Sequence, residues 1–199
     1  CQELARVAAR TSAWVFGGSF AEQVQSEPGG DGYYNTQVVF GPDGSLAGAY
    51  RKVHLFGFNG GETTVMSSGG EMVVLPGPLG RTGLATCYDL RFPELFRALV
   101  DRGAEAFVIP AGWPERRVTH WQVLARARAI ENQAYVLACN QTGTHGGVPI
   151  AGGSMVIDPQ GEVLAEAGPG EQVLSVEIDP HRVAAWRGAF PALDDRRMG

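Results

Sequence analysis

The fold is decided by the stretch Leu84-Ala85-Thr86-Cys87-Tyr88-Asp89-Leu90-Arg91-Phe92-Pro93-Glu94-Leu95. Its apolar start predicts a buried strand, and its proline predicts the first turn of a helix that opens about four residues after the cysteine. Cys87 therefore lies in a tight turn between the two. Free backbone N–H groups at such a turn favour a thiolate and can bind an oxyanion, which indicates an acyl-transfer nucleophile. The plainer interpretation is a buried core cysteine, the commoner role.

A second candidate lies upstream, in Tyr50-Arg51-Lys52-Val53-His54-Leu55-Phe56. The turn Gly41-Pro42-Asp43-Gly44 predicts a hairpin that ends on this segment, so Lys52 lies at a strand terminus. A lysine there normally faces water. Between Tyr50 and Val53, however, we expect Lys52 to be partly buried, where an amine is a usable general acid or base.

Together the two motifs resemble the nitrilase, or carbon–nitrogen hydrolase, superfamily. The resemblance covers essentially the whole chain, because further stretches match in order: 120–133, Gly152-Gly153-Ser154 and Asp158-Pro159-Gln160-Gly161-Glu162. The omega-amidase branch is the most similar. The resemblance implies a hydrolase that cleaves the C–N bond of a small amide and needs no cofactor. The four histidines form no ligand-spaced set, so no metal is expected.

The resemblance also implies roles for single residues. The Cys87 thiolate would attack the amide carbonyl, ammonia would leave, and water would hydrolyse the thioester. Lys52 and the backbone N–H of Tyr88 would stabilise the oxyanion. Glu62 matches a second glutamate that family members place beside the catalytic triad, where it orders the lysine. The alternative for Glu62 is a carboxylate that merely hydrates a glycine-rich loop.

The expected substrate carries a carboxylate, because Arg91 can reach the same pocket from the turn and a guanidinium pairs well with a carboxylate. An ion pair between Arg91 and Asp89 is the alternative. Trp113 is expected to form a wall of the pocket. The omega-amidase branch implies 2-oxoglutaramate or 2-oxosuccinamate as substrate, while related members act on deaminated glutathione or on N-carbamoyl compounds.

One part of the family pattern is missing. The general-base glutamate of the family precedes the segment that begins here at Cys1, and neither Glu3 nor Glu94 matches it. We therefore expect a chain that lacks an N-terminal portion, which raises the alternative that it is inactive by itself, as a non-catalytic binding subunit. A thiol redox sensor ranks last, because Cys139 lies in a predicted buried strand and offers no resolving partner.

Composition limits the function further. The 199 residues, 44% of them apolar, predict a single domain over residues 1–199. The net charge of −5 disfavours a nucleic-acid partner. The arginines at 116, 117, 126 and 128 are most simply a solvated or interdomain helix face, and the alternative is that one of them binds a substrate carboxylate. Three cysteines without paired spacing disfavour disulfides and zinc and indicate the cytosol. No apolar run is long enough to span a membrane.

Periodicity predicts a layered α/β fold. Helices are expected at 2–12, 93–102 and about 118–132, a loop at 26–32, and strands at 13–18, 33–40, 45–50, 71–75, 81–86, 105–109, 134–139, 150–157, 162–167 and 172–178. The resemblance sharpens this to an N-terminally truncated αββα sandwich. It also implies that subunits pair through helices into a four-layered αββααββα core, in a homodimer or higher homo-oligomer.

Overall fold

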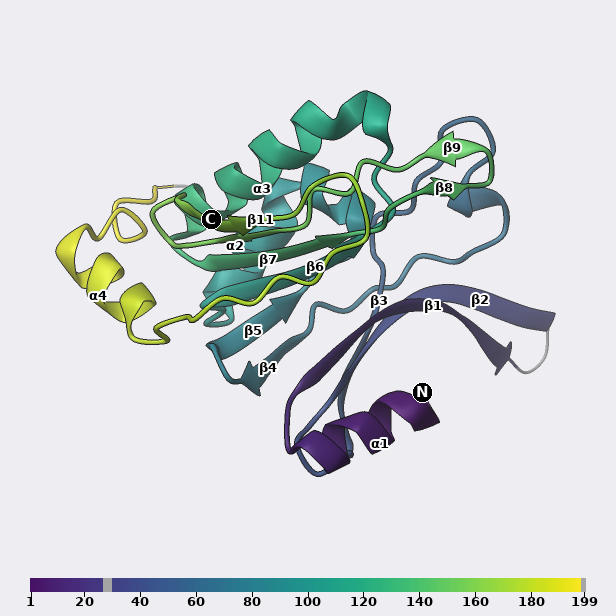
Figure 1. Ribbon diagram of the computed structural model, residues 1–199, viewed down its shortest axis with the longest axis horizontal. Coiled ribbons are helices and arrows are strands. Elements are labelled where there is room, and N and C mark those ends of the chain that lie inside the picture. Colours follow the sequence, from purple (N-terminus) through teal and green to yellow (C-terminus); the bar gives the residue numbers. More distant parts are fainter. Residues whose placement is uncertain (27–29, 198–199) are drawn as a thin grey trace.

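The computed structural model describes residues 1–26 and 30–197 and arranges them in four layers (Figure 1). Helix α1 (Gln2–Thr11) forms one outer layer, on a three-stranded sheet. A six-stranded sheet lies behind that sheet, and helices α2 (Pro93–Asp101) and α3 (Val118–Asn132) cover its far face. This order is the predicted αββα sandwich, which is therefore confirmed.

The smaller sheet is antiparallel, in the order β1 (Val15–Ser26), β2 (Gly30–Phe40) and β3 (Leu46–Arg51). The predicted turn at 41–44 joins β2 to β3, and Gly44 takes a positive φ of 80° there. A Cβ at Gly44 would lie 2.7 Å from the carbonyl oxygen of Ala5 in α1, so glycine is required for both reasons. The hairpin brings Lys52, the residue after β3, to the edge of the sandwich.

The larger sheet runs in the order β11-β10-β7-β6-β5-β4. Its centre is parallel, with α2 crossing between β5 and β6 and α3 crossing between β6 and β7. Its strands are β4 (Val74–Gly77), β5 (Gly80–Leu84), β6 (Ala106–Ala111), β7 (Tyr135–Asn140), β10 (Met155–Ile157) and β11 (Val163–Glu166). Because β5, β6 and β7 are parallel, the residues that follow them gather at one edge of the sheet, where α/β proteins place their sites.

Strand residues alternate between two cores. One core lies between the sheets and contains Val39, Tyr50, Leu84 and Val108. The other lies between the larger sheet and its helices, and includes Phe96, Leu99, Phe107, Ile109, Trp121, Ala125 and Val136. The two cores hold the ends of β3 and β5 in fixed relative positions, because Tyr50 and Leu84 pack in the same cluster.

Four local expectations need correction. The loop at 26–32 is shorter, because β1 runs to Ser26 and β2 begins at Gly30; residues 27–29 lie outside the described residues. Residues 172–178 form no strand: Val173 is 92% exposed, residues 174, 176 and 178 are half-buried, and Ile178 packs against Tyr135 and Val183. The strand expected at 150–157 is limited to β10 and an isolated bridge at Ile150. Helix α4 (Arg182–Ala189) was not predicted.

The described residues contain no helix with the length and apolar character that a membrane crossing needs. Among the same residues, no three His, Cys, Asp or Glu side chains gather into a group able to hold a metal ion.

Candidate active site

A cavity of about 840 Å³ lies at the carboxyl edge of the parallel strands. Its lining comes from β1, the segment after β3, the ends of β5, β6 and β7, and the hairpin of β8 (Thr144–His145) and β9 (Val148–Pro149). All six residues that the sequence nominated line it: Lys52, Glu62, Cys87, Tyr88, Arg91 and Trp113. Residues up to 61 positions apart are thus brought to one place.

Cys87 begins a 3-10 turn, η2 (Cys87–Arg91), and α2 follows at Pro93. The expected helix therefore opens six residues after the cysteine, because the 3-10 turn comes first. Cys87 has a φ of 50°, a left-handed conformation that costs a non-glycine residue energy and that persists only where the surroundings enforce it. The first N–H groups of the turn, including that of Tyr88, have no partner within it, so they can face a developing negative charge.

Competing groups act on the Cys87 thiol. Burial raises its pKa, and the negative charges of Glu62 and Asp89 act in the same direction. The charge of Lys52 and a hydrogen bond from the backbone N–H of Gly112 lower it, but the net shift is upward. The resting cysteine is therefore a thiol, with a cation and an N–H donor nearby to support the thiolate once it forms.

Lys52 is buried more completely than expected, with 1% of its surface exposed. Its Nζ donates to Glu62 Oε2 at 2.5 Å. The same oxygen accepts the backbone N–H of Phe56 at 2.8 Å, and Asn35 Nδ2 donates to Glu62 Oε1 at 2.7 Å. Burial alone would raise the pKa of Glu62, but Lys52 and these donors hold it below its usual range. Glu62 is thus an ionised carboxylate that fixes the lysine, not a hydrated loop residue.

Lys52 is also the only lysine in the sequence, beside 15 arginines. Arginine stays protonated in proteins, whereas a lysine amine can give up and regain a proton. The one lysine amine of the sequence is therefore buried against the cavity.

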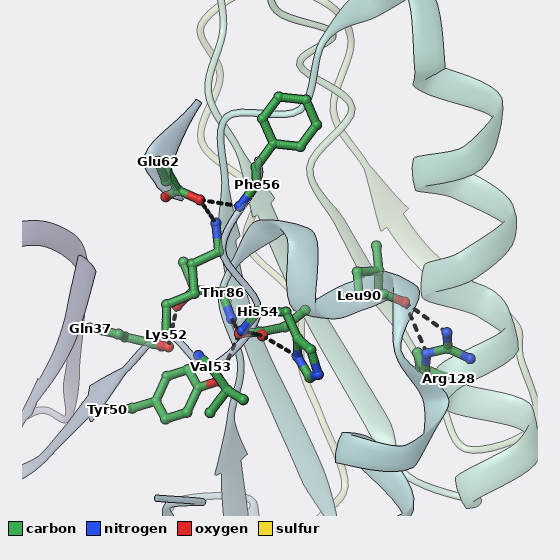
Figure 2. A network of polar contacts seen from close by, with 11 residues as sticks. Gln37, Tyr50, Lys52, Val53, His54, Phe56, Glu62, Thr86, Leu90 and Arg128 are labelled. Carbon is green, nitrogen blue, oxygen red and sulfur yellow. Dashed lines mark hydrogen bonds and ion pairs between the residues drawn. The ribbon is translucent and has the colours of Figure 1, made fainter. Parts of the chain in front are cut away.

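Figure 2 shows the polar network behind these residues. Asp89 is fully buried, and its Oδ2 accepts the Tyr50 hydroxyl at 2.7 Å and the Thr86 backbone N–H at 2.8 Å. Its Oδ1 accepts the His54 backbone N–H at 3.0 Å and lies 2.8 Å from His54 Nδ1. Burial and the adjacent Asp89 raise the pKa of Tyr50, so its hydroxyl remains a donor. One carboxylate joins the end of β3 to the end of β5.

Helix α3 holds the same turn from the other side. Arg128 is buried, and its Nε and Nη2 donate to the carbonyl oxygen of Leu90 at 3.1 and 2.8 Å (Figure 2). Its Nη1 donates to Glu131 at 2.8 Å, so the charge is partnered. Of the four arginines that composition assigned to a solvated face, Arg128 is therefore structural.

Arg91 and Trp113 form a wall of the cavity. The Arg91 guanidinium lies 4.7 Å from the Trp113 ring centroid and 5.7 Å from that of Tyr88, and its Nη2 is 3.2 Å from His120 Nδ1. The alternative of an ion pair with Asp89 is wrong, because both oxygens of Asp89 bind other donors. Arg91 pairs with no carboxylate among the described residues, which leaves its charge available to a ligand.

Further residues line the cavity, among them two of the four arginines for which binding of a substrate carboxylate was the alternative. Arg116 and Arg117 line the cavity, and the Arg117 guanidinium lies 5.7 Å from the Phe56 ring centroid. Asn140, which ends β7, is buried; its Oδ1 accepts the Trp113 backbone N–H at 2.6 Å, and its Nδ2 donates to Gly152 at 2.8 Å. Cys139 was expected to be buried, but it is exposed and lines the cavity. These contacts join segments that are distant in the sequence, so no local sequence pattern predicts them.

Comparison with known proteins agrees with this geometry. The carbon–nitrogen hydrolase family model matches residues 1–188. A 2-oxoglutaramate amidase of Paenarthrobacter nicotinovorans is 44% identical over 198 residues, which cover 98% of this chain and 67% of that protein. An omega-amidase of Saccharomyces cerevisiae is 36% identical over 211 residues, covering 99% of this chain and 69% of that protein.

Solved structures give the same result. A yeast member of branch 10 of the nitrilase superfamily has a TM-score of 0.87 at 35% identity, over 99% of this chain and 71% of that chain. A carbon–nitrogen hydrolase superfamily protein of Xanthomonas campestris also has a TM-score of 0.87, at 34% identity over 98% of this chain and 74% of that chain. The predicted superfamily and fold are confirmed, and the chain belongs to the carbon–nitrogen hydrolase family of enzymes.

Proposed function

We propose that the cavity hydrolyses the terminal amide of a small carboxylate-bearing acid, of the 2-oxoglutaramate type. The observation that carries this proposal is the grouping of a thiol, an ammonium and an unpaired guanidinium on one cavity, at Cys87, Lys52 and Arg91. The names of two similar proteins, a 2-oxoglutaramate amidase and an omega-amidase, support the same substrate class.

In the proposed reaction, the Cys87 sulfur attacks the amide carbonyl carbon, and the thiol proton is transferred to the departing nitrogen. The tetrahedral oxyanion is stabilised by the Lys52 ammonium and by the free N–H at Tyr88. The C–N bond breaks, ammonia leaves and a thioester remains. Water then adds to the thioester, and the acid departs as the Cys87 thiol re-forms. Glu62 holds Lys52 in place through the contact of 2.5 Å.

The substrate end of the cavity is cationic. Arg91 would bind the substrate carboxylate while its guanidinium lies 4.7 Å from the Trp113 ring centroid, with Nη2 next to His120. Arg117 and Arg116 add positive charge to the same lining, in a chain whose net charge is −5. This local reversal of charge favours an anionic amide over a neutral one.

A second candidate, a binding subunit without catalysis, is favoured by one observation. Glu62 is the only carboxylate among the described residues that line the cavity, and Lys52, Asn35 and the Phe56 N–H already occupy it. A second carboxylate that could accept a proton, in addition to Glu62, is therefore missing from that lining. A binding subunit would hold a carboxylate-bearing amide without releasing ammonia.

The test measures ammonia release from 2-oxoglutaramate, from N-carbamoyl amino acids and from an uncharged amide of similar length. We expect release from the first compound, loss of release in Cys87→Ala, and an increase of KM by about 10- to 100-fold in Arg91→Gln with a smaller change of kcat. Arg126→Gln is the control, because Arg126 does not line the cavity. Binding of the amide with no release would favour the binding subunit, and equal KM values for charged and uncharged amides would contradict the role of Arg91.

Self-association belongs to the proposal as well. Val123 and Ile130 lie seven residues apart on α3 and are 59% and 53% exposed, which gives this helix an apolar outer stripe. Such a stripe supports the expected homodimer through helices. Light scattering coupled to size-exclusion chromatography tests it, with Val123→Glu expected to shift the mass toward the monomer. A cytoplasmic location remains a prediction from the cysteine content.

A further inference from the structure

Asp89 lies outside the cavity lining, yet its contacts flank both reactive residues. Lys52 lies between Tyr50 and His54, which both donate to the Asp89 carboxylate. Cys87 lies between Thr86, which donates to the same carboxylate, and Asp89 itself. The donors come from the ends of β3 and β5, in the two different sheets of the sandwich (Figure 2). A single side chain thus fixes the backbone on each side of the lysine and the cysteine.

We infer that Asp89 is a positioning residue that sets the placement of the Lys52 ammonium relative to the Cys87 sulfur, and so allows the two to act on one carbonyl. This inference rests on the proposed function. Three donors, the Tyr50 hydroxyl and the backbone N–H groups of His54 and Thr86, converge on its two oxygens. The Tyr50 hydroxyl extends the network, since it accepts the Val53 backbone N–H at 3.2 Å.

A purely structural role is the competing explanation, and the chain contains a control for it. Asp158 is also fully buried, accepts the backbone N–H groups of Gln160 and Glu162 at 2.8 and 2.9 Å, and pairs with Arg182. It closes the turn between β10 and β11 and does not line the cavity. Asp158→Asn therefore removes the same kind of carboxylate without touching Lys52 or Cys87.

The first experiment compares Asp89→Asn with Asp158→Asn in the full chain. The asparagine amide would turn N–H groups toward donors, so we expect the lysine segment and the cysteine turn to shift apart. Displacements of about 1 Å can lower turnover about 100-fold, so kcat for ammonia release should fall by about 10- to 100-fold, with KM changed less than about threefold. Asp158→Asn should keep the kcat of the wild type at temperatures where it is folded.

The second experiment does not need turnover. Because Lys52 is the only lysine, a chain labelled with carbon-13 at the lysine side chain gives one Cε resonance from this residue. We expect Asp89→Asn to move that resonance and Asp158→Asn to leave it in place. Tyr50→Phe removes one donor and adds no group, so it should move the Lys52 resonance in the same direction by a smaller amount. This variant also tests the inference if Asp89→Asn does not fold.

The third experiment separates placement from charge. The charges that act on the Cys87 thiol are Lys52, Glu62 and Asp89, so loss of the Asp89 charge alone would favour the thiolate. Alkylation of Cys87 by iodoacetamide, followed at the peptide that carries Cys87, needs only the thiolate, whereas amide cleavage also needs Lys52. We expect Asp89→Asn to retain or accelerate alkylation while ammonia release falls.

Lys52→Met completes a double-mutant cycle. It should raise the pH midpoint of alkylation in the wild type, where the ammonium supports the thiolate, and should raise it less in the Asp89→Asn background. Any of three results would overturn the positioning role. These are a lysine resonance that does not move, a Lys52→Met shift of the alkylation midpoint that is equally large in both backgrounds, and a kcat of Asp89→Asn equal to that of the wild type. A wild type that releases no ammonia would contradict the proposed function, while the resonance and the cycle would still decide the inference.

Discussion

Asp89 and Asp158 are both buried aspartates that accept backbone N–H groups, but they connect very different parts of the chain. The Tyr50 hydroxyl and the His54 backbone N–H donate to Asp89 from 39 and 35 positions away, and these contacts join the two sheets. The backbone donors to Asp158 are two and four positions away and close one hairpin. The same chemistry therefore fixes a reacting pair in one place and a turn in the other.

This difference predicts which property, turnover or the free energy of unfolding, each aspartate affects. Loss of a turn contact away from the cavity lowers the free energy of unfolding and leaves the reacting residues in place. Loss of a contact between sheets shifts two segments that must meet at one carbonyl carbon. We therefore expect changes near Asp89 to act on turnover more than on the free energy of unfolding, and changes near Asp158 to do the reverse.

Lys52→Met should have the largest effect, and that effect should be on turnover. If it acted mainly on stability, the distinction between the region of Asp89 and the region of Asp158 would be wrong. Without the ammonium the oxyanion loses its charged donor, so kcat should fall by about 100- to 1000-fold, the usual cost of such a donor. The methionine fills most of the same buried space. Steady-state kinetics and thermal unfolding measured on the same preparation check this, and turnover within about threefold of the wild type would remove Lys52 from the mechanism.

Glu62→Gln should have the next largest effect, a loss of about 10-fold in kcat, because the amide still accepts a hydrogen bond but no longer balances the lysine charge. The pKa of Glu62 is lowered in the folded chain, so its contribution to stability is complete above the pKa of the unfolded chain and disappears as the pH falls through the folded value. Unfolding curves of the wild type and the variant should converge in acid, and a constant difference at every pH would contradict the ion pair.

Local patterns predicted much of the fold. The Pro-Asp-Gly sequence predicts the turn at 41–44, which exists because its hydrogen bonds lie within a few residues. The helices at 93–102 and 118–132 were found within one residue of their bounds, since their apolar stripes face a large core. Residues 172–178 failed because alternation alone does not supply a partner strand.

The site was predictable only in part, for a physical reason. Cys87 and Lys52 stand out because a thiol in a turn and a lysine in an apolar strand end are unusual where they are. Asn140, Arg117 and the partners of Asp89 owe their roles to contacts between distant segments. A single sequence does not indicate which strands are neighbours, so these residues could be found only once the sheet order was known.

Asp158→Asn tests the comparison of the two aspartates through its effect on stability. It removes a buried charge that accepts two backbone N–H groups and pairs with Arg182, so we expect a loss of about 1–3 kcal/mol in the free energy of unfolding. Denaturant unfolding measures this loss, and ammonia release at a permissive temperature should match the wild type. If kcat fell as far as in Asp89→Asn, the two aspartates would have the same function and the comparison would fail.

Glu22→Gln should have the smallest effect, because it changes an ion pair on the surface of the smaller sheet. Glu22 accepts hydrogen bonds from Arg51 at 2.8 and 2.9 Å and from Thr36 at 2.6 Å, and so links all three strands of that sheet. Arg51 holds the pKa of Glu22 at about 2 against a usual value of 4.5. Solvent screens a pair this exposed, so it contributes less than about 1 kcal/mol at neutral pH.

The sign of its pH dependence follows from the lowered pKa of Glu22. The stabilisation is complete above about 4.5 and is lost as the pH falls toward 2, because the folded chain then takes up the proton that the unfolded chain has already bound. The difference in unfolding free energy between the wild type and Glu22→Gln should therefore shrink over this range, and it should also shrink in high salt. A difference that grows in acid would show that Glu22 acts through packing of the three strands and not through its charge.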